Sequence, residues 1–520
     1  MTDNKLSLST LESWLWDSAN ILRGSIDSSD FKNYIFGLLF LKRSNDVFEE
    51  EVENIMTRDG VSREEAEDET YFQMPIESRW EAIKKETENI GIALDKAFAG
   101  IERENTSLEG VMTATKFGDK EKLSDELLQR LLRHFNQHSL RNSHLESNDL
   151  LGDAYEYLIK MFADDAGKKG GEFYTPRGVV QLIVQLIKPE PKQKIYDPTC
   201  GSGGMLIESA RYIAEQSNGK VGNNINVSLF GQEKNLGTWA IGKLNMLLHN
   251  FMDADIRKGD TLITPQHKNE NNELDLFDRV IANPPFSMDG WWTPAENSIE
   301  VKLDKNGKEK RITPNYTKEV TDPYGRFQFG IPPRGYADLA FLQHMIAVLK
   351  QDGKAGVVLP HGTLFRSGTE GTIRKALLEA DLVEGIVGLP SALFYNTGIP
   401  ASIWIINKNK TEAQKGKVTI IDASSDYKEG KNQNELLPEH ITKIVNAYDG
   451  ATDVEKYMRI VTISELAEND YNLNISRFID TSEAEVEVDI KSVHQKLSEL
   501  EKKEAQIDEK LAVFLKELGV

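Results

Sequence analysis

The sequence is nearly free of cysteine, since Cys200 is the only one among 520 residues. A single cysteine excludes an internal disulfide framework and a cysteine-based zinc site, and we predict no metal site of another kind. Long apolar runs are also missing, so we expect no membrane span and no membrane partner. Residues 1–15 lack the basic and apolar segments of a secretory signal. We therefore expect a cytoplasmic protein.

Net positive charge is missing as well. The chain has 62 Lys and Arg against 83 Asp and Glu, a formal net charge of −21. A free-standing DNA-binding protein normally has a basic surface, because neutralised phosphates supply most of its affinity. The charge is uneven, however: residues 1–150 sum to −12, residues 151–410 to 0 and residues 411–520 to −9. The neutral middle can approach DNA, but we expect the chain to act poorly on DNA alone.

The apolar pattern changes along the chain and predicts four segments. Residues 31–42 are apolar on most faces, which predicts a buried helix, and residues 121–135 have a stripe of helical period. Together they predict an all-α N-terminal domain, residues 1–150. In residues 151–410, short β-branched runs alternate with helical patterns. This alternation predicts an α/β fold with a doubly wound, mainly parallel, Rossmann-like sheet whose last strand ends near Lys408. Residues 411–482 are interpreted as a connecting segment.

The last segment, residues 483–520, predicts a long helix. Its apolar residues follow a 4-3 spacing from Val486 to Leu518, interrupted by Glu504. Such a heptad seam is typical of a helix that docks on a partner helix, although packing back onto its own domain gives the same pattern.

Acidic residues follow three successive predicted strands. Asp197 begins the turn Asp-Pro-Thr-Cys-Gly-Ser-Gly-Gly204, Glu233 ends the next strand, and Asp260 follows the third. Glycines allow close backbone approach to a ligand, but the motif is not the dinucleotide fingerprint. A carboxylate at the strand end would repel a pyrophosphate, and it suits a ligand that carries an amine and a sulfonium. The turn therefore favours S-adenosylmethionine over NAD, with Glu233 on the ribose and Asp260 on the adenine amino group. Each acid taken alone is more typical of a helix cap or a surface charge, and it is their recurrence after three successive strands that favours a cofactor site.

A second loop, Asn283-Pro284-Pro285-Phe286, follows a further strand. An exocyclic amine is a weak nucleophile, and two acceptors on its hydrogens would make it more reactive. The Asn283 side-chain oxygen and the Pro284 carbonyl can be those acceptors, while the prolines hold the loop rigid. Phe286 offers a ring on which a base can stack. A base in duplex DNA must be flipped out to reach such a loop, and the reaction needs mainly positioning.

With these two loops, the sequence resembles the amino-methyltransferases of DNA. Gly171-Glu-Phe-Tyr-Thr-Pro-Arg177 is similar to the family's remaining cofactor segment. Gly335-Tyr-Ala-Asp-Leu-Ala-Phe-Leu-Gln-His344 and Asp470-Tyr-Asn-Leu-Asn-Ile-Ser-Arg-Phe478 resemble the methylation (modification) subunit of type I restriction–modification systems. The resemblance implies a Rossmann-like methyltransferase sheet and N6-adenine methylation of double-stranded DNA, a site-specific reaction that protects host DNA from restriction.

The resemblance also implies site residues and partners. The expected partners are a specificity subunit that recognises the DNA sequence, a second copy of the methylation subunit, and a restriction and translocase subunit. The expected catalytic residues are Asn283, Pro284, Pro285 and Phe286. The expected S-adenosylmethionine contacts are Glu172, Phe173, Tyr174, Thr175, Pro176, Arg177, Asp197, Gly201, Ser202, Gly203, Gly204, Glu233 and Asp260.

Several alternatives stay open at the level of sequence. Methylation of cytosine N4 or of a protein glutamine amide could use the same second loop, and an inactive assembly scaffold could retain the fold. The insertion 287–336 can be a lid, a DNA-facing loop or a solvated insertion. The target DNA sequence cannot be read from this chain. Too few residues follow the predicted sheet for a recognition domain, so we expect another chain to recognise the DNA.

Overall fold

The computed structural model describes residues 5–147, 150–165, 174–216, 226–292, 300–303, 309–312, 322–394, 398–431, 433–481 and 490–517. The chain divides into two compact units, Met1–Ile479 and Asp480–Val520. The finer division of the first unit at residues 150 and 410 stays a prediction.

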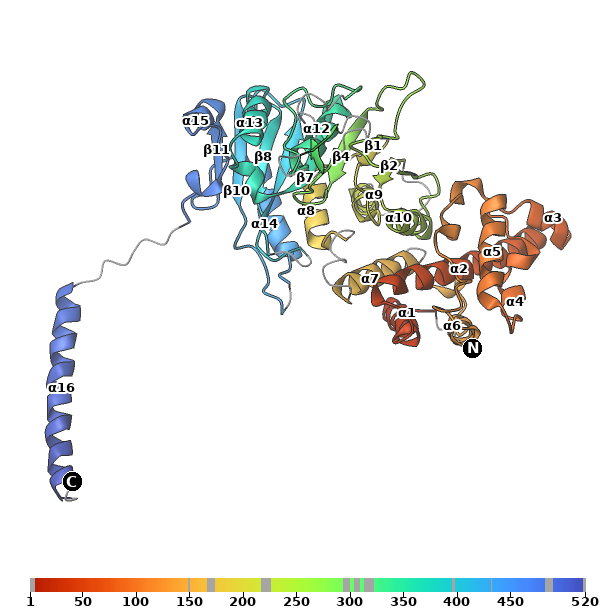
Figure 1. Ribbon diagram of the computed structural model, residues 1–520, viewed down its shortest axis with the longest axis horizontal. Helices are drawn as coiled ribbons and strands as arrows, with labels where there is room; N and C mark the ends of the chain where they lie inside the picture. Colours follow the sequence, from red (N-terminus) through yellow and green to blue (C-terminus); the bar gives the residue numbers. More distant parts are fainter. Residues whose placement is uncertain are drawn as a thin grey trace. The chain divides into compact units, whose positions relative to one another are not determined.

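The N-terminal part is helical, as its apolar stripes predict (Figure 1). Its helices are α1 (Leu8–Leu22), α2 (Ser28–Asp59), α3 (Arg63–Asp68), α4 (Trp80–Ile83), α5 (Ile90–Glu104), α6 (Asp125–Phe135) and α7 (Leu150–Asp165). Helix α6 begins after Ser124, whose side chain caps it by accepting a hydrogen bond from the Leu127 amide. Helix α7 packs on α2 through Phe36 and Tyr155, with ring centroids 4.1 Å apart.

A nine-stranded sheet follows, and its order is β11-β10-β8-β9-β7-β4-β1-β2-β3. The strands are β1 (Lys194–Asp197), β2 (Ser228–Glu233), β3 (Asp255–Lys258), β4 (Phe277–Ala282), β7 (Leu349–Pro360), β8 (Val383–Gly388), β9 (Ala401–Asn407), β10 (Lys417–Asp422) and β11 (Met458–Thr462). Strands β1, β2, β3, β4 and β7 pair in parallel, β10 pairs in parallel with β8, and β9 is antiparallel to both its neighbours. The prediction of a mainly parallel sheet is therefore confirmed. A separate hairpin contains β5 (Glu300–Leu303) and β6 (Glu309–Ile312).

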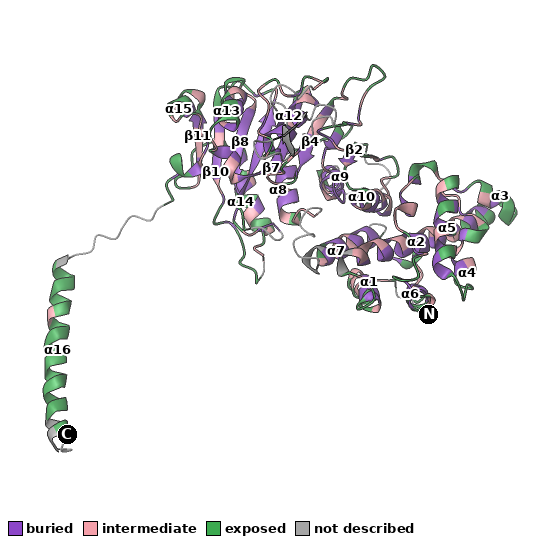
Figure 2. Ribbon diagram, in the orientation of Figure 1, coloured by how far each residue is buried: buried purple, intermediate pink, exposed green. Residues whose placement is uncertain are grey.

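Helices cover both faces of the large sheet, and side chains that alternate along the strands build a core on each face. The helices of this part are α8 (Arg177–Ile187), α9 (Gly204–Gln216), α10 (Leu236–Leu248), α12 (Asp338–Ala347), α13 (Thr369–Glu379), α14 (Pro438–Gly450) and α15 (Ile463–Glu468). In β9, for example, Ile405 joins the core with α8, α9 and α14, whereas Trp404 joins the core with α12 and α13. Figure 2 shows the buried strands between these layers.

The expectation that the sheet ends near Lys408 is wrong. Strand β10 pairs with β8, and β11 pairs with β10, so residues 417–462 extend the same sheet. Strands β10 and β11 mix exposed and half-buried residues with buried ones, whereas the central strands β8 and β9 are buried throughout, and β11 is an edge strand. A short strand at an edge gives a weak sequence signal.

The described part of the second unit contains one helix, α16 (Ile490–Glu517). Its seam residues Val493, Leu497, Leu500, Ile507, Leu511 and Phe514 are all exposed, and Leu500 reaches 64%. Val486 and Leu518, the ends of the predicted seam, lie outside the described residues. Among the helices in the described ranges, none is long and apolar enough to cross a membrane.

Candidate active site

The carboxyl end of β1 places Asp197 inside the protein. Its side chain is 2% exposed, and one oxygen accepts a hydrogen bond from the Thr199 amide at 2.9 Å. Burial raises the pKa of Asp197 to about 8, and the nearby Glu233 carboxylate adds to this increase. A buried acid with a raised pKa is a typical feature of functional sites. A cation bound next to it would stabilise the ionised form.

The turn after Asp197 brings the backbone close to its neighbours. Gly203 has φ +84°, a backbone conformation that favours glycine, and a Cβ there would meet the end of the Met246 side chain of α10 unless that side chain moved. Gly204 begins α9, and the space beside it is open. Cys200 is buried, and its sulfur lies below β2, 2.9 Å from where a Cβ on Gly231 would be. The thiol therefore packs between the turn and β2, and burial raises its pKa.

The two other acids lie at the ends of β2 and β3, as predicted. Glu233 accepts hydrogen bonds from the amides of Gly201 at 3.1 Å and Asn235 at 2.7 Å, and burial raises its pKa. Asp260 accepts hydrogen bonds from the Leu262 and Ile263 amides and forms an ion pair with Lys234 at 2.8 Å. The Asp260 carboxylate thus has little free acceptor capacity unless Lys234, which is 69% exposed, moves away.

The second loop leaves β4 at Asn283. The Asn283 amide nitrogen donates a hydrogen bond to Thr175 Oγ1 at 3.0 Å, while its Oδ1 is buried and has no hydrogen-bond partner. A buried acceptor without a partner is costly, so such a group is expected to bind a donor that the free protein lacks. Pro284 is buried and Pro285 exposed, and Phe286 packs edge to face on Phe394 with centroids 5.4 Å apart.

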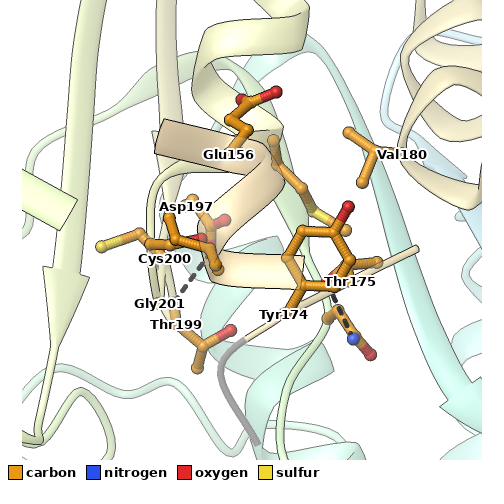
Figure 3. Close-up of a pocket in the computed structure, with 13 residues that line it drawn as sticks. Glu156, Tyr174, Thr175, Val180, Asp197, Thr199, Cys200 and Gly201 are labelled. Atoms are coloured by element: carbon orange, nitrogen blue, oxygen red, sulfur yellow. Dashed lines mark hydrogen bonds between the residues drawn. The ribbon is translucent and has the colours of Figure 1, made fainter. Parts of the chain in front are cut away.

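Two cavities meet at these loops, and Thr199 and Asn283 line both. The smaller is lined by Asp197, Gly201, Ser202, Gly204, Tyr174 and Thr175, among others. Figure 3 shows Asp197, Thr199 and Gly201 on one side of it and Tyr174 and Thr175 on the other. The larger, of about 950 Å³, is lined by Glu233, Asp260, Pro285 and Phe341, among others. Its volume is at the upper end for small-ligand pockets.

Part of the predicted cofactor segment lies away from these cavities or outside the described residues. Glu172 and Phe173 lie outside the described residues. Pro176 immediately precedes α8 and makes no capping hydrogen bond, and Arg177 is 58% exposed and lies 4.0 Å from Glu208. Both line a third cavity, with Tyr174 and Leu436. Of the segment, the structure thus brings Tyr174 and Thr175 to the loops of β1 and β4.

Sequence reasoning missed the contribution of the N-terminal helices. Lys32 and Asn33 of α2 line the larger cavity, and Glu156 and Ile159 of α7 line the smaller one. Because these residues belong to amphipathic helices, their pattern predicts only a buried face. Asp30, in the first turn of α2, also lines the larger cavity.

Comparison with known proteins identifies the family to which this chain belongs. Residues 146–487 match the model of the N-6 DNA methylases, and residues 11–135 match that of the HsdM N-terminal domain. The chain belongs to the N-6 DNA methylase family. It is 38% identical over 425 residues to a type I restriction enzyme MjaVIII methylase subunit from Methanocaldococcus jannaschii, covering 77% of this chain and 68% of that protein. It is 32% identical over 443 residues to the HindI methylase subunit of Haemophilus influenzae, covering 79% of this chain and 91% of that one.

A solved structure supports the same family. A type I restriction–modification methyltransferase subunit from Streptococcus thermophilus is 32% identical, with a TM-score of 0.76, and the match covers 92% of this chain and all of that one. The chain is thus a type I methylation subunit and a DNA methyltransferase. S-adenosylmethionine is the methyl donor of this family. The site fits this cofactor, because the buried Asp197 lines the smaller cavity and suits a cation, and the open space beside Gly204 leaves room for a ligand at the turn.

Proposed function

We propose that this subunit transfers a methyl group to the N6 amino group of a flipped-out adenine in double-stranded DNA. The observation that carries the proposal is Asn283 Oδ1, a buried acceptor without a partner that lines both cavities. The fixed hydrogen bond from Asn283 to Thr175 orients the amide so that this oxygen is available for an amine hydrogen.

The residues around Asn283 divide the work between cofactor and base. Asp197, Gly201–Gly204, Tyr174 and Thr175, with Glu172 and Phe173, would hold S-adenosylmethionine. Glu233 would bind its ribose, and Asp260 would bind its adenine once Lys234 moves away. The bound cofactor supplies an electrophilic methyl group on a sulfonium. Asn283 and the Pro284 carbonyl would accept the two hydrogens of the target amine, and Phe286 would stack on the base. The gain in rate comes from orientation, since no covalent intermediate with the protein is needed.

We propose that the target sequence is chosen by a separate specificity subunit, and that two methylation subunits and a restriction subunit complete the assembly. Each relative named above is a subunit of a type I restriction enzyme. The exposed apolar seam of α16 supports a docking role for the second unit, since an isolated helix of this kind lacks a core of its own. The net charge of −21 supports delivery to DNA by a less acidic partner.

The proposal is tested by methyl transfer from labelled S-adenosylmethionine to DNA, with the methylated base identified by mass spectrometry. The chain is assayed with and without its specificity subunit. We expect N6-methyladenine, and at least about tenfold more of it when the specificity subunit is present. N4-methylcytosine as the product, or full sequence-specific activity from the chain alone, would contradict the proposal.

The Asn283→Ala variant tests the role of Asn283 Oδ1, the buried acceptor without a partner. We expect kcat to fall by about a hundredfold or more, because one oriented polar group is removed from the reacting amine. Cofactor affinity should stay within about twofold of wild type. Asn283→Asp is the matched variant, since it keeps an acceptor oxygen and should retain more activity. Equal loss of cofactor binding and turnover would mean that the two loops do not divide the work as proposed.

A further inference from the structure

The residue that follows the Asn283–Phe286 loop has an unusual backbone. Ser287 has φ +52°, in the left-handed region, although it is not a glycine. Non-glycine residues rarely adopt this conformation, and they keep it only where their surroundings hold it. Phe286 comes immediately before Ser287, so the backbone of Ser287 sets the direction in which the chain leaves the loop.

Contacts with residues 333–338 hold the backbone where the chain leaves the Asn283–Phe286 loop. The Ser287 amide donates a hydrogen bond to Asp338 Oδ1 at 2.8 Å, and the Ala337 amide donates one to Met288 O at 3.2 Å. Two further bonds join Gly290 N to Arg334 O at 3.0 Å and Trp291 Nε1 to Pro333 O at 2.9 Å. Residues 287–291 and 333–338 are thus fastened together at the two ends of the predicted insertion 287–336.

Asp338 is the buried member of this contact. Its side chain is fully buried at the start of α12, and its Oδ2 lies 3.3 Å from Nη1 of Arg366. The same Arg366 nitrogen lies 3.3 Å from Glu370, its Nη2 donates to Ser287 Oγ at 3.4 Å, and its guanidinium stacks on Tyr336 at 4.2 Å. A buried carboxylate requires such a counter-ion. Arg366 therefore contacts both the acid and the residue that the acid holds.

We propose that Asp338, with Arg366 as its counter-ion, is a positioning residue that keeps Ser287 left-handed and so aims the Asn283–Phe286 loop at the target base. Asp338 lines neither cavity at the loops, so it is not a catalytic residue. The inference rests on the proposed function of that loop. It goes beyond it by assigning the loop's geometry to a buried acid on a different element.

The first experiment compares Asp338→Ala with Asp338→Asn in the complex with the specificity subunit. Alanine removes the acceptor, whereas asparagine keeps an oxygen for the Ser287 amide and loses only the charge. We expect kcat to fall by about a hundredfold for alanine, as is typical when a reacting group is misplaced by about 1 Å. Asparagine should retain most of the activity. Cofactor affinity should stay within about twofold of wild type in both variants.

The second experiment uses Ser287 itself. Glycine adopts positive φ freely, so Ser287→Gly should need Asp338 less. The double variant Ser287→Gly, Asp338→Ala should recover at least about tenfold of the activity lost in Asp338→Ala. If Asp338→Ala does not fold, Ser287→Val serves instead, because a β-branched residue opposes positive φ without touching the buried acid. It should lower kcat at unchanged cofactor affinity.

A readout without chemistry keeps the test independent of the proposed function. Amide hydrogen exchange of a peptide covering 283–290 should be faster in Asp338→Ala than in wild type, and near wild type in Asp338→Asn. Glu384→Gln is the matched control, a buried acid with its own cation, Lys354 at 2.8 Å, that lines neither cavity. It should leave that exchange unchanged. Equal exchange in Asp338→Ala and wild type, or no recovery by Ser287→Gly, would overturn the inference even where wild-type methylation is confirmed.

Discussion

Replacing Asp197 with asparagine should make the free protein more stable while weakening cofactor binding. In the free protein the acid is 2% exposed, and its pKa is raised to about 8 by burial. Because the folded state holds this proton more tightly than the unfolded chain, stability falls as pH rises from about 4 to 8. Asparagine resembles the protonated acid, keeps an oxygen for the Thr199 amide and has no proton to lose.

The size of the effect follows from the shift. In the unfolded chain this acid ionises above about pH 4, whereas in the folded protein it stays protonated up to about pH 8. At pH 7, which is about three pH units above the unfolded pKa, the folded state is disfavoured by about 1.4 kcal/mol for each of these units. Asp197→Asn should therefore raise the free energy of unfolding by up to about 4 kcal/mol at pH 7, and by close to nothing near pH 4. The cofactor's positive charges favour the ionised acid, so the variant should bind it about tenfold to a hundredfold more weakly.

Thermal unfolding of both proteins without cofactor, between pH 5 and pH 8, measures the first effect. The difference in Tm should grow steadily with pH over this range. Isothermal titration with S-adenosylmethionine at pH 7 measures the second. A difference in Tm that does not depend on pH would refute the assignment of the raised pKa to Asp197. Unchanged cofactor affinity would refute its role as the acid beside the cation.

Three further changes have defined outcomes. Gly203→Ala should destabilise the fold by about 2–4 kcal/mol, because alanine opposes its positive φ and overlaps Met246; chemical denaturation measures this, and Gly204→Ala, with open space beside it, should cost far less. Lys354→Met should cost about 3–5 kcal/mol by leaving buried Glu384 without its cation, again by denaturation, and a milder loss would show that Tyr448 and Asn407 suffice as partners. Removal of residues 480–520 should leave Tm and cofactor affinity unchanged but abolish co-purification with the specificity subunit; a large drop in Tm would contradict a separate docking unit.

The elements that position chemistry were predictable from sequence because their signals are local. The acids Asp197, Glu233 and Asp260 each lie at or just after the end of a strand. The sequence alone therefore places them together at the carboxyl ends of the parallel strands. The turn at Gly201–Gly204 and the loop at Asn283 are likewise continuous in sequence. Their roles toward cofactor and base stay proposals.

The structural features that could not be predicted from the sequence depend on contacts between distant segments. The ion pair of Asp260 with Lys234 and the hydrogen bond of Asn283 to Thr175 depend on side-chain directions that no pattern specifies. Strands β10 and β11 were missed because long-range pairing, and not local composition, adds them to the sheet. The φ of Ser287 was equally hidden, because serine gives no sign of a left-handed backbone.

The larger cavity is built by two parts of the chain, with Lys32 and Asn33 from α2 facing Glu233 and Asp260 from the sheet. Any ligand that fills it therefore acts as a non-covalent cross-link between the helices and the sheet. By mass action, a ligand present at a hundred times its Kd adds about 2.7 kcal/mol to the folded state. That stabilisation is shared by both parts, so a subunit loaded with its methyl donor should melt as one cooperative body. Without the donor, the N-terminal helices should separate from the sheet at a lower temperature than the rest of the subunit unfolds.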